Sequence, residues 1–112
     1  MLQPDGHLLR IFIGESDKKD GAPLYQWIVR AAKREGLSGA TVLRGMEGFG
    51  AHSKIHDSKF LDMSADLPII IEIVDTLEKI DAFLPTIDAA IIEGMATVEP
   101  VHVRFYRGSK KP

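Results

Sequence analysis

The chain has 112 residues, of which 45% are hydrophobic and 27% are charged, as expected for one ordinary globular domain spanning 1–112. It contains no cysteine, which excludes disulfides, thiolate nucleophiles and zinc ribbons, and its net charge of −2 argues against a general nucleic-acid binder. The N-terminal MLQPDGH lacks the basic-then-apolar pattern of a signal peptide, and the longest apolar run, 67–71, is too short to span a bilayer, so we expect a cytoplasmic protein.

The first half of the chain predicts a strand, a helix and a second strand. Apolar residues alternate through 7–13, as in a strand with both faces largely covered. Asp20 before Pro23 suits the start of a helix, and Gly36 suits its end. The buried stripe of this helix has the spacing of an amphipathic helix and comprises Leu24, Trp27, Ile28, Ala31 and Ala32. The second strand is predicted over 40–46.

The next elements are a strand beginning at Pro68, where a missing N–H is tolerated, and a second helix. Asp75 with Glu78 three residues later predicts the N-cap and capping box of that helix. Its buried stripe is predicted to be Leu77, Ile80, Leu84, Ile87 and Ile91. Pro85 lies inside this pattern and predicts a kink or a restart.

Gly94 is predicted to end the second helix, and 97–107 is predicted to be the last strand. Pro100 within it favours an edge strand, and 108–112 is expected to be a frayed tail. The order β-α-β-β-α-β predicts an α+β, ferredoxin-like fold, with a four-stranded antiparallel sheet and both helices on one face. The other sheet face then lacks cover, and its apolar candidates favour self-association: Phe12, Val42, Ile70 and Val74.

A long polar loop, 46–62, separates the second and third strands. It greatly exceeds a hairpin turn, and loops of this length in compact domains are usually functional or disordered, so we expect it to be mobile without ligand. Its glycine-rich bend, Gly48-Phe49-Gly50, allows close backbone approach and exposes N–H groups that suit an anion. Phe49 suits stacking on a base or insertion into a partner.

Four runs carry a specific resemblance: GAPLYQWIVRAAKREGLSGATVLRGMEGFG, HSKIH, LPIIIEIVDTLEKIDAFLP and IIEGMATVEPVHV. In these runs the chain resembles a bacterial and archaeal family, catalogued as a domain of unknown function, within the PII-like superfamily. The resemblance implies a homotrimer whose open sheet faces line a central channel. It also implies a small effector, often a nucleotide, bound between subunits at the loop base, and a loop that docks a protein partner such as a membrane transporter or an enzyme.

The sequence departs from PII proper in the segment before the last strand. Where PII has a basic, glycine-rich loop that cradles phosphates, this chain has Glu93-Gly94-Met95-Ala96-Thr97-Val98, with one glycine, no lysine and a carboxylate. This difference argues against binding ATP in the PII manner. The long loop also has no tyrosine, which excludes tyrosine modification there.

The residues predicted to bind a small anionic ligand, with a nucleotide as one possibility, are Arg44, Gly48, Phe49, Gly50, Ser53 and Arg104. Those predicted to bind the partner are Phe49, His52, Lys54 and His56. Arg44, Arg104 and Arg107 could form a cationic cleft in a trimer, or instead make intersubunit salt bridges with Glu47, Glu72 or Glu99.

Three alternatives remain open on the sequence. His52 and His56, with Asp57 and Asp62 nearby, have a spacing that could hold a metal on a helix, and Ser53 beside them could serve a small hydrolase. A structural trimer without a ligand is the third. We expect no catalytic residues, no cofactor, no resident metal and no nucleic-acid partner, since Gly48-Phe49-Gly50 matches an RNA-recognition motif only weakly.

Overall fold

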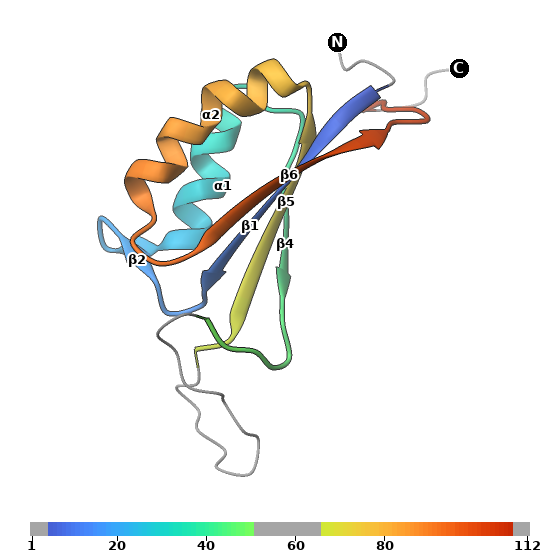
Figure 1. Ribbon diagram of the computed structural model, residues 1–112. Helices are drawn as coiled ribbons and strands as arrows, with labels where there is room; N and C mark the ends of the chain where they lie inside the picture. The colour runs from blue at the N-terminus through green and yellow to red at the C-terminus, as the bar shows by residue number, and fades with distance from the viewer. Residues whose placement is uncertain (1–4, 51–65, 109–112) are drawn as a thin grey trace.

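The computed structural model describes residues 5–50 and 66–108, and it has the predicted ferredoxin-like architecture (Figure 1). The four main strands are β1 (Asp5–Gly14), β4 (Thr41–Arg44), β5 (Pro68–Asp75) and β6 (Met95–His102). They form one antiparallel sheet in the order β4-β5-β1-β6. Helices α1 (Leu24–Arg34) and α2 (Leu77–Ala90) both cover one face, and a small hairpin, β2 (Lys18–Lys19) with β3 (Ala22–Pro23), precedes α1.

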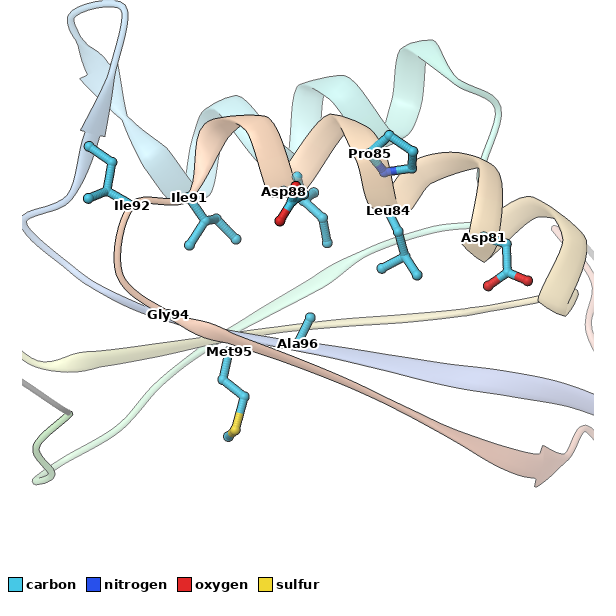
Figure 2. A pocket seen from close by; sticks show the side chains of 10 residues that line it. Asp81, Leu84, Pro85, Asp88, Ile91, Ile92, Gly94, Met95 and Ala96 are labelled. Atoms are coloured by element: carbon cyan, nitrogen blue, oxygen red, sulfur yellow. The ribbon is translucent and has the colours of Figure 1, made fainter.

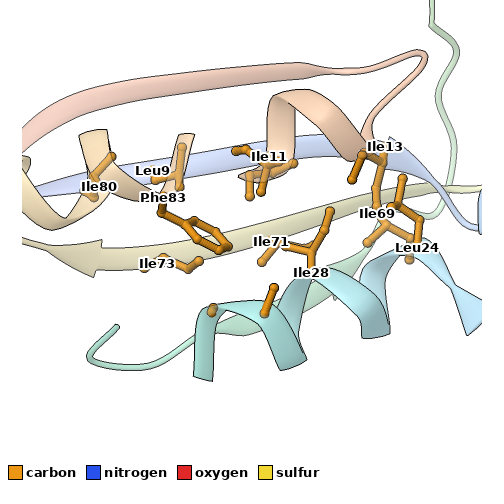
Figure 3. Close-up of a cluster of buried hydrophobic side chains, with 14 residues drawn as sticks. Leu9, Ile11, Ile13, Leu24, Ile28, Ile69, Ile71, Ile73, Ile80 and Phe83 are labelled. Atoms are coloured by element: carbon orange, nitrogen blue, oxygen red, sulfur yellow. The ribbon is translucent and has the colours of Figure 1, made fainter. Parts of the chain in front are cut away.

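The core lies between the helices and the two central strands (Figure 3). Alternate residues of β1 and β5 point toward the helices and are fully or almost fully buried: Leu9, Ile11, Ile13, Ile69, Ile71 and Ile73. The helices contribute Leu24, Ile28, Ala31, Ala32, Ile80, Phe83, Ile87 and Ala90. Burial of each large side chain contributes about 1.5–3 kcal/mol, which makes this layer the main stabilising feature of the fold.

Helix α1 starts and ends by different means. Its N-cap is Pro23, so the helix begins at this proline as predicted, but no side chain caps it and Asp20 does not take part. Asp20 has a φ of 53° and Gly21 a φ of 81°, because both form the tight turn of the β2–β3 hairpin. The predicted stop is confirmed: Gly36 has a φ of 79°, and Leu37 N–H donates to the Ala32 carbonyl at 3.1 Å.

The predicted capping box of α2 is wrong by one residue. Thr76 is the N-cap, and its hydroxyl accepts from the Lys79 N–H at 3.2 Å. Asp75 is instead buried at the end of β5, where its carboxylate accepts from the backbone N–H groups of Ser38 and Thr76 at 2.8 and 2.7 Å. Asp75 therefore joins the turn that follows α1 to the start of α2.

The buried face of α2 is rotated relative to the prediction. Leu77 is 43% exposed, whereas Phe83 and Ala90, which the predicted stripe omitted, are buried. The helix continues through Pro85, so it does not restart there, and it ends at Ala90. Gly94 is therefore a residue of the connection to β6 and not the helix stop.

The sheet register identifies the residues of the open face, which is the face of the sheet without helices. Phe12 pairs with Ile70, and Val74 pairs with Leu8, so the predicted positions Phe12, Ile70 and Val74 lie on the face opposite the helices. Val42 pairs with the buried Ile71 and therefore lies on the helix-bearing face; its assignment to the open face was wrong by one position. Leu43, opposite Ile70 and 44% exposed, occupies the open face instead.

An ion-pair cluster crosses the middle of the open face. Arg10 donates from Nε to Glu72 at 3.0 Å and from Nη1 to Glu99 at 2.5 Å. The hydrogen bond to Glu72, opposed in part by desolvation and supported by the charge of Glu99, raises the pKa of the Arg10 guanidinium. The open face is thus mixed in character, with apolar residues at each end and charges between them.

The last strand is shifted from its predicted bounds. It starts at Met95 and ends at His102, so Arg104 and Tyr106 follow the strand and do not belong to it. The early start follows from full pairing with β1, in which Phe12 faces Met95 and Asp5 faces His102. The expectation of an edge strand is confirmed, since β6 pairs with β1 alone.

Candidate functional site

A cavity of about 680 Å³ lies at the base of the long loop, and we call it the loop-base cavity. One wall is the glycine-rich bend Gly48–Gly50, and the opposite wall is the connection that leads into β6. The C-terminal end of β1 and the start of β5 form its floor, with Phe12 and Pro68 among the lining residues. The predicted bend and the connection Ile92–Met95 therefore meet within one copy of the chain.

Close packing on Pro68 fixes the first wall. Gly45 N–H donates to the Pro68 carbonyl at 2.7 Å. A Cβ at Gly45 would lie 2.5 Å from Pro68 Cγ, and one at Gly48 would lie 3.1 Å from the same atom. Glycine is required here because larger residues would push the bend away from the start of β5. Phe49, between these contacts and Gly50, is 69% exposed.

The second wall depends on Gly94. A Cβ at this residue would lie 2.6 Å from the Phe12 carbonyl oxygen, so only glycine lets the chain enter β6 directly beside β1. Glu93 precedes it and is half-buried. Its Oε2 is shielded from solvent and has no hydrogen-bond partner among the described residues.

The remaining polar group of the loop-base cavity is Asp66. Its Oδ1 accepts from the Ser16 N–H at 2.8 Å, and it lies so close to Gly14 that a Cβ there would be 2.5 Å from Oδ2. Sequence reasoning missed Asp66, because nothing in its local pattern marks it. Among the described residues that line the cavity, two are carboxylates and none is basic.

The C-terminal ends of β4 and β6 lie at opposite ends of the sheet (Figure 1). The two predicted arginines are therefore far apart within one chain, since Arg44 ends β4 and Arg104 follows β6. Arg44 ends β4 near the loop base, where its Nε lies 3.1 Å from Glu15 Oε2; its side chain is 60% exposed. Arg104 follows β6 and lines a second cavity of about 510 Å³. Beside it, Tyr106 donates to the Ser38 carbonyl at 2.6 Å. The two arginines could share a ligand only across two copies of the chain.

A groove of about 780 Å³ also runs between α2 and β6 (Figure 2). Leu84 and Ile91 point from the helix toward the sheet, and Ala96 points back toward the helix. Asp81 and Asp88 supply its only charged lining among the described residues. The groove adjoins the loop-base cavity at the start of β6, where the two share Ile92, Gly94 and Met95.

The other predicted site residues, Ser53, His52, Lys54 and His56, lie outside the described residues, as does most of the predicted mobile loop. Within 5–50 and 66–108, no group of three or more His, Cys, Asp or Glu side chains could hold a metal ion. In the same ranges, neither helix has the length and apolar character needed to cross a membrane.

Comparison with known proteins identifies relatives over nearly the whole chain. Residues 6–103 match the DUF190 family model, described as "Uncharacterized ACR, COG1993". A UPF0166 protein of Aquifex aeolicus is 40% identical over 98 residues, which cover 88% of this chain and 92% of the relative. A UPF0166 protein of Methanocaldococcus jannaschii is 37% identical over 102 residues, which cover 90% and 92% of the two chains.

Solved structures share the fold at lower identity. CPII from Thiomonas intermedia K12, bound to ADP and bicarbonate, has a TM-score of 0.57, is 20% identical and is matched over 88% of each chain. A putative PII-like signaling protein from Thermus thermophilus has a TM-score of 0.59, is 20% identical and is matched over 87% of each chain. The predicted family is confirmed: the chain belongs to the DUF190/UPF0166 family and has the fold of PII-like signalling proteins.

Proposed function

We propose that this protein is a PII-like regulator that binds a small anionic effector, with a nucleotide as the leading candidate, and controls a protein partner through its long loop. The observation that carries the proposal is the loop-base cavity, in which the glycine-rich bend of the loop faces the connection into β6. A ligand held there would contact Gly48–Gly50 at the start of the long loop and Asp66 at its end. Ligand binding and the conformation of the loop would therefore be coupled.

The ligand class follows from two lines of support. CPII structures of the same fold contain ADP, AMP and bicarbonate, all of them anions. In this chain, Arg44 at the loop base and Arg104 beyond β6 are exposed cations that could neutralise such charges. Because they lie at opposite ends of the sheet, Arg44 and Arg104 could act on one effector only if Arg104 of a neighbouring copy reaches the loop-base cavity, and we propose this arrangement in a homotrimer.

The partner would meet the loop. Phe49 is a large aromatic side chain, 69% exposed, next to the cavity, and exposed aromatics of this kind commonly anchor interfaces. His52, Lys54 and His56 extend the proposed contact surface along the sequence. Catalysis is not part of the proposal, and the working compartment we propose is the cytoplasm.

The test is isothermal titration calorimetry, which measures the affinity of the full chain for ADP, AMP and bicarbonate. Charge-assisted hydrogen bonds contribute roughly 1.5–3 kcal/mol each, so Arg44→Ala and Arg104→Ala should each weaken binding by about one to two decades. Arg30→Ala, which removes an exposed cation from α1, is the matched control and should leave the affinity unchanged.

Phe49→Ala separates stacking from charge in the same titration. It should weaken nucleotide binding while sparing bicarbonate, because the substitution removes an aromatic surface and no charge. If the wild-type chain binds none of the three compounds, the proposed function is wrong. If a nucleotide binds and neither Arg44 nor Arg104 matters, the arginine assignment is wrong.

A further inference from the structure

Glu93 carries an unsatisfied hydrogen-bond acceptor on the wall of the loop-base cavity. Its Oε2 is the only side-chain nitrogen or oxygen atom of the described residues that is shielded from solvent and lacks a partner. A buried acceptor without a donor is unfavourable, more so when it is charged, and native proteins rarely retain one without a reason. Because Oε2 is shielded from solvent, the Glu93 side chain must turn toward the cavity before a donor of a bound molecule can reach this atom and remove the penalty.

The surroundings of Glu93 restrict what that molecule can present. Asp66, the other carboxylate, already accepts from the Ser16 N–H, and no described lining residue is basic. A phosphate or carboxylate placed against Glu93 would meet like charge in a partly desolvated site, which is strongly unfavourable. A neutral hydroxyl or amino group would meet a good acceptor.

The apolar lining favours a ring system beside that donor. Phe12, Phe49 and Met95 line the same cavity, and its volume of about 680 Å³ falls within the range of small-molecule sites. An aromatic base or a sugar ring can pack on these side chains while one of its polar groups reaches the carboxylate. A nucleoside combines these two features.

We propose that Glu93 Oε2 accepts a hydrogen bond from a hydroxyl or amino group of a bound nucleoside, so that this cavity holds the nucleoside end of the effector and excludes its phosphate. The inference rests on the proposed function and adds the orientation of the ligand. The phosphate then lies away from Glu93, toward the exposed arginines. Glu93 thereby determines specificity, since an inorganic anion alone gains nothing from it.

The decisive measurement is the direction in which Glu93→Gln changes the affinity for AMP. The substitution conserves volume and removes the charge, so the carboxylate-assisted bond is lost and AMP should bind about tenfold more weakly. Glu78→Gln makes the same charge change on α2 outside the cavity lining and should have no effect. Tighter binding by Glu93→Gln would mean that phosphate lies against Glu93, and an unchanged affinity would mean that Glu93 is not used; either result overturns the proposal.

Two analogues of AMP identify the donor. The 2′,3′-dideoxy analogue lacks the sugar hydroxyls, and inosine monophosphate lacks the amino group. The analogue without the relevant donor should bind the wild type about tenfold more weakly than AMP but bind Glu93→Gln as well as AMP does. Equal losses in both proteins for both analogues would overturn the proposal.

The outcomes separate this inference from the proposed function. If AMP and ADP bind the wild type with no dependence on Glu93, the orientation is wrong and the proposed function stands. If neither AMP nor ADP binds the wild type, effector recognition through a nucleotide is wrong, and this inference is wrong with it.

Discussion

Single glycines position the walls of the loop-base cavity, because backbone and proline ring approach too closely for a side chain. At Gly45 and Gly48 the close neighbour is Pro68, whose ring can shift slightly. At Gly94 the neighbour is the backbone oxygen of Phe12, which is fixed in the sheet. The cost of a methyl group should therefore be greatest at Gly94.

Gly94→Ala should lower the free energy of unfolding by about 1–3 kcal/mol, since the new Cβ would overlap a carbonyl oxygen in the central strand. Urea denaturation measures the change. Gly39→Ala is the control, because a Cβ there would have no heavy atom within 4 Å and no positive φ to strain. Equal stability of the two variants would contradict the close approach described at Gly94.

At the level of elements, the strands and helices were predicted well where periodicity is strong. The spacing of α1 identified its buried face correctly, whereas β1 was expected to be largely covered on both faces and is fully buried on one. The capping of α2 was misjudged because Asp75 and Thr76 are both good N-cap residues, and only the tertiary bond to Ser38 determines which is used. Val42 was misplaced because a four-residue edge strand gives too few alternations to fix its parity.

The candidate site was harder to predict than the fold. The glycine-rich bend was predicted to allow close backbone approach to an anion; the close neighbour in the structure is Pro68, and the ligand contact stays a prediction. The acidic lining of the cavity was not predicted, because Asp66 and Glu93 lie 27 positions apart and come together through the pairing of β1 with both β5 and β6. Such proximity depends on sheet topology and leaves no local pattern.

The buried face of α2 predicts which of its side chains stabilise the protein most. Phe83→Ala should destabilise the protein by about 3–5 kcal/mol, because it removes a fully buried aromatic side chain from the core. Leu77→Ala should cost less than about 1 kcal/mol, since Leu77 is 43% exposed and its loss leaves no cavity. Thermal or urea unfolding measures the change in the free energy of unfolding for both variants. A larger decrease for Leu77→Ala than for Phe83→Ala would favour the buried stripe predicted from the sequence.

For the whole molecule, the open sheet face is the surface that bears on assembly. It presents apolar side chains at both ends and the Arg10 ion pairs between them. A face of this mixed kind can match a second copy of itself through apolar contacts and hydrogen bonds together. We therefore expect self-association through this face, in the trimer that the proposed function requires.

Leu43→Asp should weaken the trimer, because a charge on the open face would be desolvated in the interface at a cost of several kcal/mol. Val42→Asp is the matched control, since Val42 lies one position away on the same strand but on the helix-bearing face. Sedimentation equilibrium at micromolar concentration reports the assembly state. A monomeric wild type would contradict the trimer, and dissociation by Val42→Asp alone would contradict the choice of face.

The position of β1 between β5 and β6 also has a consequence for the order of events on the ribosome. Asp5 contacts His102, 97 positions later, and Arg10 contacts Glu99, 89 positions later. The edge of β1 that pairs with β6 therefore stays unpaired until β6 has been synthesised. A nascent chain halted before β6 should leave that edge of β1 open to chaperones, and its closure should mark the final step of folding.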